Sequence, residues 1–330
     1  MKALALFSGG LDSMLAIKLI VDQGIDVVAI HIKTGFGGTK DITELMRSRA
    51  LKAGAELEVI DVRDEYIQKI LFDPVYGYGK NFNPCIDCHG YMFKVAKGLM
   101  EKFDASFLIT GEVLGQRPMS QRSDALKQVI KLSEDKDNLI VRPMSAKLMD
   151  KTAPEINGWI DREKLLDISG RSREEQMRLA DFYGWEDYES PGGGCLLTEE
   201  HFSHRIREFI EHDKLTVDEI DLLKFGRHFR LPDGAKFVVG RDQEDNKGLE
   251  SIKSDKYISV NLPIGGPFSL LSKEASKEDR ELASKIAITY TRSSPNESYD
   301  IVLGEDEIIR VSPFPEKKDA QKYFFNAKPN

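Results

Sequence analysis

Short apolar runs alternate with longer amphipathic stretches over the first 145 residues of the chain. The amphipathic stretches space their apolar residues as a helix does, for example at Leu11, Leu15 and Leu19 and over residues 91–103. The runs are partly β-branched and predict five strands, at residues 2–7, 26–32, 57–62, 106–111 and 139–143. Strands that alternate with helices predict an α/β fold, in which an open parallel sheet carries helices on both faces.

The pattern changes near residue 190, where a glycine-rich segment occupies residues 189–195. Beyond it, predicted helices and a hairpin turn lie among short strands, at residues 199–212, 216–224, 277–292 and 304–306. This mixture predicts a second, smaller α+β domain. We therefore expect two domains, at residues 1–197 and 198–330.

The first predicted strand ends in a Ser-Gly-Gly turn at residues 8–10, and a helix begins near Leu11. Such a turn suits a phosphate, because the first amides of a helix lack partners and glycines let an anion approach the backbone. Ser8 and Ser13 add hydroxyl donors, whereas the Asp12 carboxylate repels a phosphate unless a cation such as Mg²⁺ lies between them. A glycine-rich turn without a ligand is the alternative for the two glycines alone.

The string SGGLDS at residues 8–13 resembles the SGGxDS motif of the PP-loop ATP pyrophosphatases, which have a Rossmann-like fold. The resemblance implies that ATP is a substrate cleaved between its α- and β-phosphates, with AMP transferred to an oxygen of the acceptor. Nitrogen or sulfur then replaces that oxygen. The nucleotide-binding residues expected in this way are Ser8, Gly9, Gly10, Asp12, Ser13 and Ile30. Ile30, near the end of the second predicted strand, is the expected adenine contact.

The chain contains three cysteines, Cys85, Cys88 and Cys195, and the first two form a C-x-x-C pair ahead of a predicted helix. A helix N-terminus lowers the pKa of a thiol, so we expect thiolates here. Three thiolates without a fourth fit a [4Fe–4S] cluster with one open iron. Zinc usually takes four ligands, the CIDCH string formally matches a c-type haem site, and buried reduced thiols are the plain alternative.

Two further segments resemble enzymes that thiolate tRNA. Residues 83–93 resemble the N-P-x-x-x-C-N segment of the tRNA 2-thiouridylases, with Cys88 at their cysteine position. Residues 104–121 resemble the T-G-E-x-x-G-Q-x-x-S-Q stretch of the 4-thiouridine synthases, and residues 140–151 resemble the segment that follows it. The resemblance implies adenylation and thiolation of a tRNA uridine. It adds Thr110, Gly111 and Gln116 to the nucleotide site.

The resemblance gives catalytic roles to Asp12, Cys88 and Cys195. In a version with a cluster, Cys85, Cys88 and Cys195 hold the iron, and an open iron presents the sulfur. In a version without one, Cys88 or Cys195 carries a persulfide and its partner resolves a disulfide. The expected sulfur donor of the enzyme is sulfide or a cysteine desulfurase.

A formal net charge of −8 leaves no whole-molecule field that attracts RNA, so RNA must be held locally. Eight basic residues outnumber five acidic ones over residues 117–151, where Arg117, Arg122 and Lys147 are the expected phosphate contacts and a solvated face is the alternative. Residues 237–252 and 281–294 resemble the RNA-binding domain of NFACT proteins. The resemblance implies RNA contact at Arg241, and a lid or oligomerisation domain is the alternative.

The N-terminal residues carry no signal-peptide pattern, and no long apolar run is present, so we expect a cytoplasmic protein without membrane contact. We also expect no THUMP-type RNA-binding region ahead of the turn and no rhodanese-like cysteine domain after it. Two rival functions stay open: a PP-loop synthase that adenylates a small molecule, and a nucleotide-binding redox or iron sensor without turnover. A homodimer is compatible with each.

Overall fold

The computed structural model describes residues 1–188 and 194–325. The chain divides into two compact units, Met1–Thr198 and Glu199–Asn330. Residues 189–193, most of the predicted glycine-rich boundary, lie outside the described residues.

The first unit is built on a parallel five-stranded sheet in the order β3-β2-β1-β4-β5. Its strands are β1 (Lys2–Leu6), β2 (Asp26–Lys33), β3 (Glu56–Asp61), β4 (Phe107–Thr110) and β5 (Ile140–Val141). The central strand β1 pairs with β2 from Lys2 opposite Asp26 to Leu6 opposite Ile30. The predicted α/β fold is confirmed, and the turn that follows β1 leaves the middle of the sheet.

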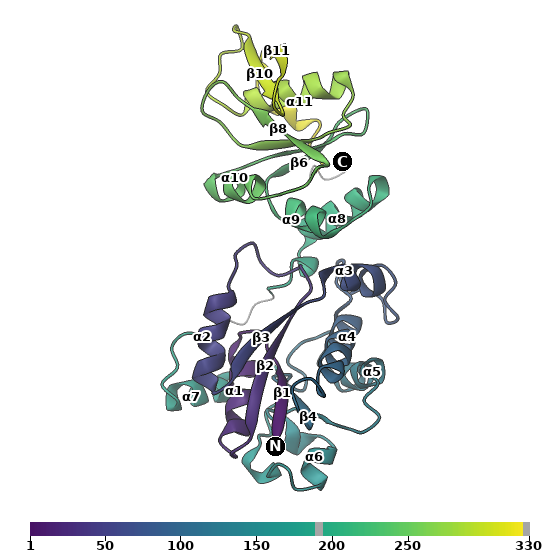
Figure 1. The fold of residues 1–330 in the computed structure, drawn as a ribbon, viewed down its shortest axis with the longest axis vertical. Helices are drawn as coiled ribbons and strands as arrows, with labels where there is room; N and C mark the ends of the chain where they lie inside the picture. Colours follow the sequence, from purple (N-terminus) through teal and green to yellow (C-terminus); the bar gives the residue numbers. More distant parts are fainter. Residues whose placement is uncertain (189–193, 326–330) are drawn as a thin grey trace. The chain divides into compact units, whose positions relative to one another are not determined.

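Helices cover both faces of this sheet (Figure 1), with α1, α2 and α7 on one face and α4 and α5 on the other. The helices of the unit are α1 (Leu11–Val21), α2 (Thr43–Ala53), α3 (Arg63–Tyr66), α4 (Cys85–Gly98), α5 (Ser123–Ser133), α6 (Ala153–Ile156) and α7 (Glu174–Phe182). Single 3₁₀ or π turns occupy Ile67–Leu71, Ala146–Leu148, Arg162–Lys164 and Leu196–Thr198.

The helix predicted at residues 91–103 is placed too late, because α4 runs from Cys85 to Gly98. Its first turn, residues 85–88, shows no helical periodicity of apolar residues and is held by a contact with the preceding loop. The buried Asp87 carboxylate accepts hydrogen bonds from the backbone of Val75 and Tyr76, at 2.6 and 3.1 Å. The two cysteines of the C-x-x-C pair therefore lie inside the first helical turn rather than before it.

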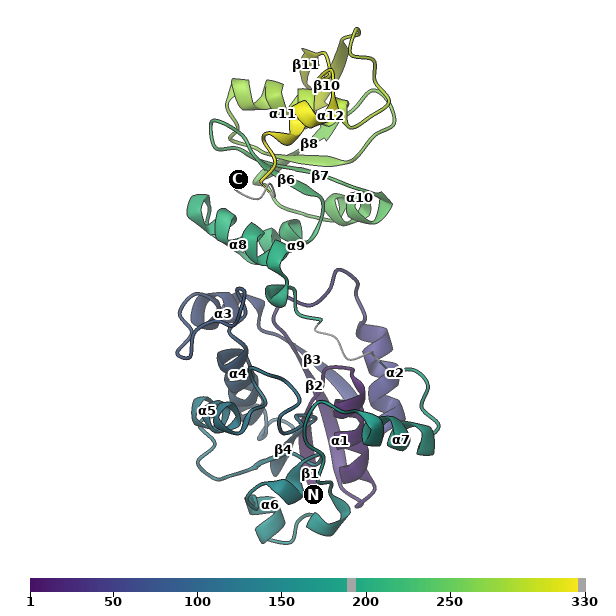
Figure 2. The same cartoon turned by 180° about the vertical axis from the view of Figure 1, so that it is seen from behind.

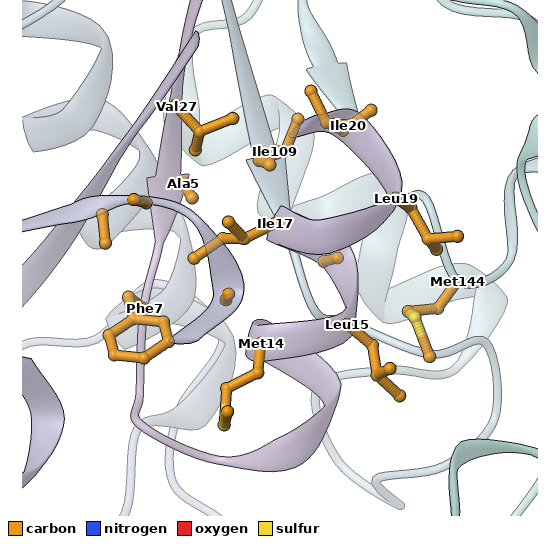
Figure 3. Packing of buried hydrophobic residues seen from close by; sticks show 14 of the residues in the cluster. Ala5, Phe7, Met14, Leu15, Ile17, Leu19, Ile20, Val27, Ile109 and Met144 are labelled. Atoms are coloured by element: carbon orange, nitrogen blue, oxygen red, sulfur yellow. The ribbon is translucent and has the colours of Figure 1, made fainter. Parts of the chain in front are cut away.

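Helix α1 is apolar around most of its circumference, and it is buried accordingly. Figure 3 shows Met14, Leu15 and Ile17 of this helix packed among Phe7 and Ile109 from the neighbouring chain segments. A helix that is apolar on every side belongs in a core. Here the sheet lies on one side of α1, and α2 and α7 pack against it elsewhere. The N-terminus of α1 is thus fixed by the best-packed part of the unit.

The second unit contains an antiparallel six-stranded sheet in the order β11-β10-β8-β9-β7-β6. Its strands are β6 (Arg227–Arg230), β7 (Lys236–Val239), β8 (Tyr257–Asn261), β9 (Ser269–Ser272), β10 (Tyr299–Leu303) and β11 (Glu307–Val311). The helices are α8 (Glu200–His212), α9 (Val217–Lys224), α10 (Gln243–Glu250), α11 (Lys277–Thr289) and α12 (Lys317–Gln321). The predicted α+β domain and its hairpin at residues 304–306 are confirmed.

Successive side chains of β7 enter two different cores, as the alternation of a strand requires. Phe237 and Val239 pack with residues of α11, whereas Val238 packs with residues of α9 and α10. Figure 2 shows α10 and α11 within this unit from the second side. Within the described residues of the whole chain, no helix has the length and apolar character needed to cross a membrane.

Candidate active site

The turn after β1 has the form of an anion cradle. Gly9 has φ +78°, in the left-handed region that favours glycine. The Ser13 hydroxyl donates a 2.7 Å hydrogen bond to the Gly10 carbonyl, and the Gly10 N–H lies 3.4 Å from the Ser8 hydroxyl. Ser8 is exposed, whereas Ser13 is buried beneath the turn. The predicted residues therefore surround the N-terminus of α1, where backbone amides favour a phosphate.

Arg49, a buried residue of α2, fixes this turn from behind. One guanidinium N–H donates to the Gly9 carbonyl at 3.1 Å, and a second donates to the Asp187 carboxylate at 3.0 Å. The sequence analysis missed Arg49, because an arginine in an amphipathic helix ordinarily belongs to its solvent-facing side. Only the tertiary structure places it under the turn.

Asp12 and Gln116 meet across 104 positions of sequence. The Gln116 side-chain amide donates a 2.7 Å hydrogen bond to Asp12 Oδ2, and the buried Gln176 amide donates to Gln116 Oε1 at 3.1 Å. The other carboxylate oxygen, Asp12 Oδ1, is buried and accepts no hydrogen bond within the described chain. It lies 3.8 Å from the guanidinium of Arg173, which the sequence analysis also missed. Asp12 Oδ1 is an oxygen ligand of the type that Mg²⁺ prefers, so this donor fits the expected cation.

Gly111 is placed by contact with the backbone of α1. A Cβ added at Gly111 would lie 2.5 Å from Ser13 N and 2.7 Å from Asp12 O. The neighbouring Thr110 is buried at the end of β4, and its hydroxyl accepts the Glu112 N–H at 3.3 Å. Segment 110–112 therefore supports the turn directly.

Ile30, the expected adenine contact, lies inside the sheet. Its side chain is buried, and its carbonyl accepts the Phe7 N–H at 2.9 Å. β2 continues beyond it to Lys33. The role of Ile30 as an adenine contact stays a prediction.

The cysteines of the C-x-x-C pair are half-buried, and desolvation of their thiols reverses the expected direction of the pKa shifts. Burial raises the pKa of Cys88 to about 12, although a hydrogen bond from the Tyr66 hydroxyl opposes the rise. Burial also raises the pKa of Cys85, whose sulfur accepts a 3.1 Å hydrogen bond from the Asn83 amide. The expectation that the helix N-terminus makes these thiols acidic is wrong, because desolvation outweighs it.

The three cysteines share one neighbourhood. Negative charge on Cys195 and on Cys85 raises the pKa of Cys88, and all three act on the pKa of Tyr66 after the larger effect of its burial. Among the described residues, no three or more His, Cys, Asp or Glu side chains are grouped closely enough to hold a metal ion. In a [4Fe–4S] cluster, however, each thiolate binds a different iron, so the thiols stand further apart than ligands of one ion. Three soft donors in one neighbourhood are of the type and number that such a cluster takes, and the cluster stays a prediction.

A buried ion network joins the cysteines to the turn. Glu112 accepts hydrogen bonds from His89 Nδ1 at 2.8 Å and from Arg142 Nε at 2.9 Å. Burial disfavours the Glu112 charge, but the charge of Arg142 and the hydrogen bond from His89 outweigh it, so the pKa of Glu112 lies below its usual range. His89 follows Cys88, and Glu112 follows Gly111, which packs against α1. The hydrogen bond between His89 and Glu112 therefore connects the thiol pair to the N-terminus of α1.

The four expected RNA contacts differ in how well their charges are neutralised. Arg122, which precedes α5, forms an ion pair with Asp124 of that helix, and the Lys147 ammonium donates to the Glu163 carbonyl at 2.8 Å. Arg241 binds both carboxylate oxygens of Asp245, at 2.6 and 3.0 Å.

Arg117 is exposed, and its guanidinium forms no ion pair with any described residue. Its positive charge partly opposes the rise that burial causes in the pKa of Cys85. Arg117 is therefore near the cysteines, with its charge available to a polyanion.

Two models of known protein families match the chain. A family model described as "Thiamine biosynthesis protein (ThiI)" matches residues 1–169. The chain belongs to the ThiI family. A second model, "NFACT protein RNA binding domain", matches residues 226–324 of this ThiI-family chain. Both predicted resemblances are thus confirmed.

The ThiI-family chain is also similar to curated proteins named for tRNA thiolation. It is 26% identical to a "Probable tRNA sulfurtransferase" of Thermococcus kodakarensis over 51% of this chain and 40% of that protein. It is 34% identical to a "tRNA-specific 2-thiouridylase MnmA" of Dehalococcoides mccartyi over 32% of each. The matches thus span less than half of these relatives. A solved "4-thiouridine synthetase - RNA complex with bound ATP" is 19% identical over 56% of this chain and 51% of that one, with a TM-score of 0.36.

Proposed function

We propose that this ThiI-family protein uses ATP to replace a carbonyl oxygen of a tRNA uridine with sulfur. One observation carries the proposal: segment 110–112 lies against both parts of the site. Gly111 contacts the N-terminus of α1, and Glu112 accepts a hydrogen bond from His89 of α4, the helix that contains Cys85 and Cys88. An enzyme that activates an oxygen and then replaces it with sulfur needs its nucleotide site and its sulfur site in one cavity. The position of segment 110–112 between the two supports such an arrangement.

The turn at residues 8–13 would bind the phosphates of ATP, with Asp12 Oδ1 as a ligand for Mg²⁺. A uridine carbonyl oxygen attacks the α-phosphorus, a new O–P bond forms, and the bond to pyrophosphate breaks. The amides of the turn and the nearby cations stabilise the charge that collects on the leaving pyrophosphate. A sulfur nucleophile then adds to the uridine carbon and AMP leaves with the oxygen, so the base exchanges oxygen for sulfur.

Cys85, Cys88 and Cys195 would hold a [4Fe–4S] cluster, which supplies an open iron for sulfide when it is bound. In the cluster-free version, Cys88 or Cys195 carries a persulfide whose outer sulfur attacks the base. The remaining thiolate then attacks the inner sulfur, the S–S bond to the base-bound sulfur breaks, and the two cysteines are left as a disulfide, which an external dithiol must reduce. Sulfide would supply the sulfur in the cluster version. In the cluster-free version the donor would be a cysteine desulfurase, whose own persulfide passes its outer sulfur to the cysteine thiolate without a further oxidant.

The proposed RNA partner is tRNA. Support comes from the match of residues 226–324 to an RNA-binding domain and from the names of the relatives. Arg117 is the most suitable phosphate contact in the first unit, because its charge is not neutralised by a described acidic residue. Arg122, Lys147 and Arg241 would each have to exchange a protein partner for a phosphate.

Pyrophosphate release tests the proposal. With ATP, Mg²⁺ and unmodified tRNA, the wild-type protein should release pyrophosphate, and Asp12→Asn should not, while both show the same circular dichroism. Release without RNA but with a small molecule would support a PP-loop synthase instead. If no pyrophosphate is released under any of these conditions, the result would support a nucleotide-binding redox or iron sensor without turnover.

A further inference from the structure

Three of the side chains at and around Asp12 carry a buried polar atom that makes no hydrogen bond with any described residue. Within the part of the chain that the structure describes, Asp12 Oδ1, Arg173 Nε and Gln176 Oε1 are buried and make no hydrogen bond. Buried polar groups are nearly always hydrogen-bonded in folded proteins, because an unpaired one costs about 1–3 kcal/mol. Asp12 Oδ1 lies 3.8 Å from the Arg173 guanidinium, and Gln116 links Gln176 to Asp12 by hydrogen bonds, so the three side chains belong to one cluster at the N-terminus of α1. A polar ligand at this cluster would supply the missing hydrogen bonds of Asp12 and Arg173.

Arg173 is held where its charge can serve such a ligand. It immediately precedes α7, its side chain is 12% exposed, and its guanidinium is 3.8 Å from Asp12 Oδ1. Gln176 follows one helical turn later on the same side of the helix, and it is completely buried. Gln176 holds Gln116, and Gln116 occupies Asp12 Oδ2. The carboxylate is thereby turned so that Oδ1 faces Arg173.

This arrangement answers the electrostatic problem that Asp12 creates. A carboxylate next to a triphosphate is repelled by it unless positive charge lies between them. The expected Mg²⁺ is one source of that charge, and the structure contains a second in the guanidinium. An arginine offers five N–H donors in a planar fork, so it can face a carboxylate on one side and phosphate oxygens on another.

We propose that Arg173 is a further ATP-binding residue, whose guanidinium bridges the Asp12 carboxylate and the phosphates of ATP. Gln176 and Gln116 are positioning residues that orient Asp12 for this bridge. The inference rests on the proposed use of ATP and deepens it. Such a bridge adds affinity for ATP that does not require a divalent cation. Only a ligand with phosphates gains this affinity.

Calorimetric titration of the full-length protein tests the bridge. The ligands are α,β-methylene-ATP, which resists cleavage at the reacting bond, and adenosine, each with Mg²⁺ and with EDTA. Replacement of a charged hydrogen bond by a neutral side chain should weaken binding of the ATP analogue to Arg173→Gln roughly 10- to 100-fold under both conditions. Adenosine affinity should not change, and Arg173→Lys should recover part of the loss. Arg178→Gln is the matched control, because Arg178 is an exposed arginine of α7 that forms an ion pair with Glu175.

The outcomes separate the inference from the proposed function. Unchanged affinity for the ATP analogue in both Arg173 variants would overturn the bridge. An equal loss for the analogue and for adenosine would also overturn it, since that result marks a merely structural residue. If Arg173→Gln does not fold, the Lys variant decides by the same comparison. If the wild-type protein binds neither ligand, the proposed use of ATP itself is wrong.

Discussion

Replacement of Gly111 by alanine should damage the nucleotide site through a backbone collision. The added Cβ would lie 2.5 Å from Ser13 N and 2.6 Å from Asp12 C, where ordinary contacts begin near 3.4 Å. The obstacle is the backbone of the first turn of α1, which a side-chain rotation cannot relieve. Either segment must shift by roughly 0.5–1 Å, and overpacking of this kind costs about 1–3 kcal/mol.

For a unit of this size, each kcal/mol lowers the unfolding temperature by about 2–4 °C, so we expect a fall of about 2–12 °C. Tryptophan fluorescence is a suitable assay, because both tryptophans, Trp159 and Trp185, belong to the first unit. Affinity for α,β-methylene-ATP should fall as well, since the turn moves with α1. Gly98→Ala is the control: Gly98 ends α4, and no atom lies within 4 Å of its added Cβ. Wild-type unfolding and wild-type nucleotide affinity in Gly111→Ala would refute this reasoning.

Three other consequences can be measured. In protein stripped of metal, Cys88 should react with iodoacetamide at pH 8.5 far more slowly than a simple thiol does, because its pKa is raised to about 12. The rate should increase as the pH rises towards that pKa. Equal rates for Cys88 and a simple thiol at pH 8.5 would contradict the raised pKa. Glu112→Gln leaves the buried Arg142 without a charged partner, so denaturant unfolding should show a loss of about 3–5 kcal/mol. The pKa of Glu112 is lowered in the folded protein, so the stabilisation by its charge is fully present above the unfolded pKa of about 4.3. That stabilisation is lost as the pH falls through the folded pKa. A Glu112→Gln variant as stable as wild type at pH 7 would contradict the role of this charge. Arg117→Ala should weaken tRNA binding in a filter assay more than Arg122→Ala, because Arg122 is already paired; equal effects would count against the assignment.

The sequence predicted the parts of the site that lie in local motifs. Apolar periodicity was enough for the parallel sheet, and the SGGLDS string marked the turn and Asp12. The resemblance over residues 104–121 brought in Gly111 and Gln116, which the structure places against α1 and on Asp12. In each case a residue type is restricted by its immediate neighbours in the chain, so the pattern is visible before folding.

The residues that the sequence did not reveal act through tertiary packing. Arg49 and Arg173 have the spacing of ordinary solvent-facing arginines, and their roles follow from what the fold places beside them. The pKa of Cys88 was misjudged for the same reason: its position at a helix start is local, but the burial that controls its ionisation is not. The start of α4 was missed because the preceding loop, bound by Asp87, holds its first turn.

The most direct test of the proposed thiolation is mass spectrometry of tRNA nucleosides after incubation with the purified protein, ATP, Mg²⁺ and sulfide under anaerobic conditions. The wild-type protein should convert a uridine to a thiouridine, with one oxygen exchanged for sulfur. Asp12→Asn, and wild-type protein given α,β-methylene-ATP, should give none. Thiouridine formed without cleavable ATP, or unmodified tRNA together with ATP turnover on a small molecule, would contradict the proposal.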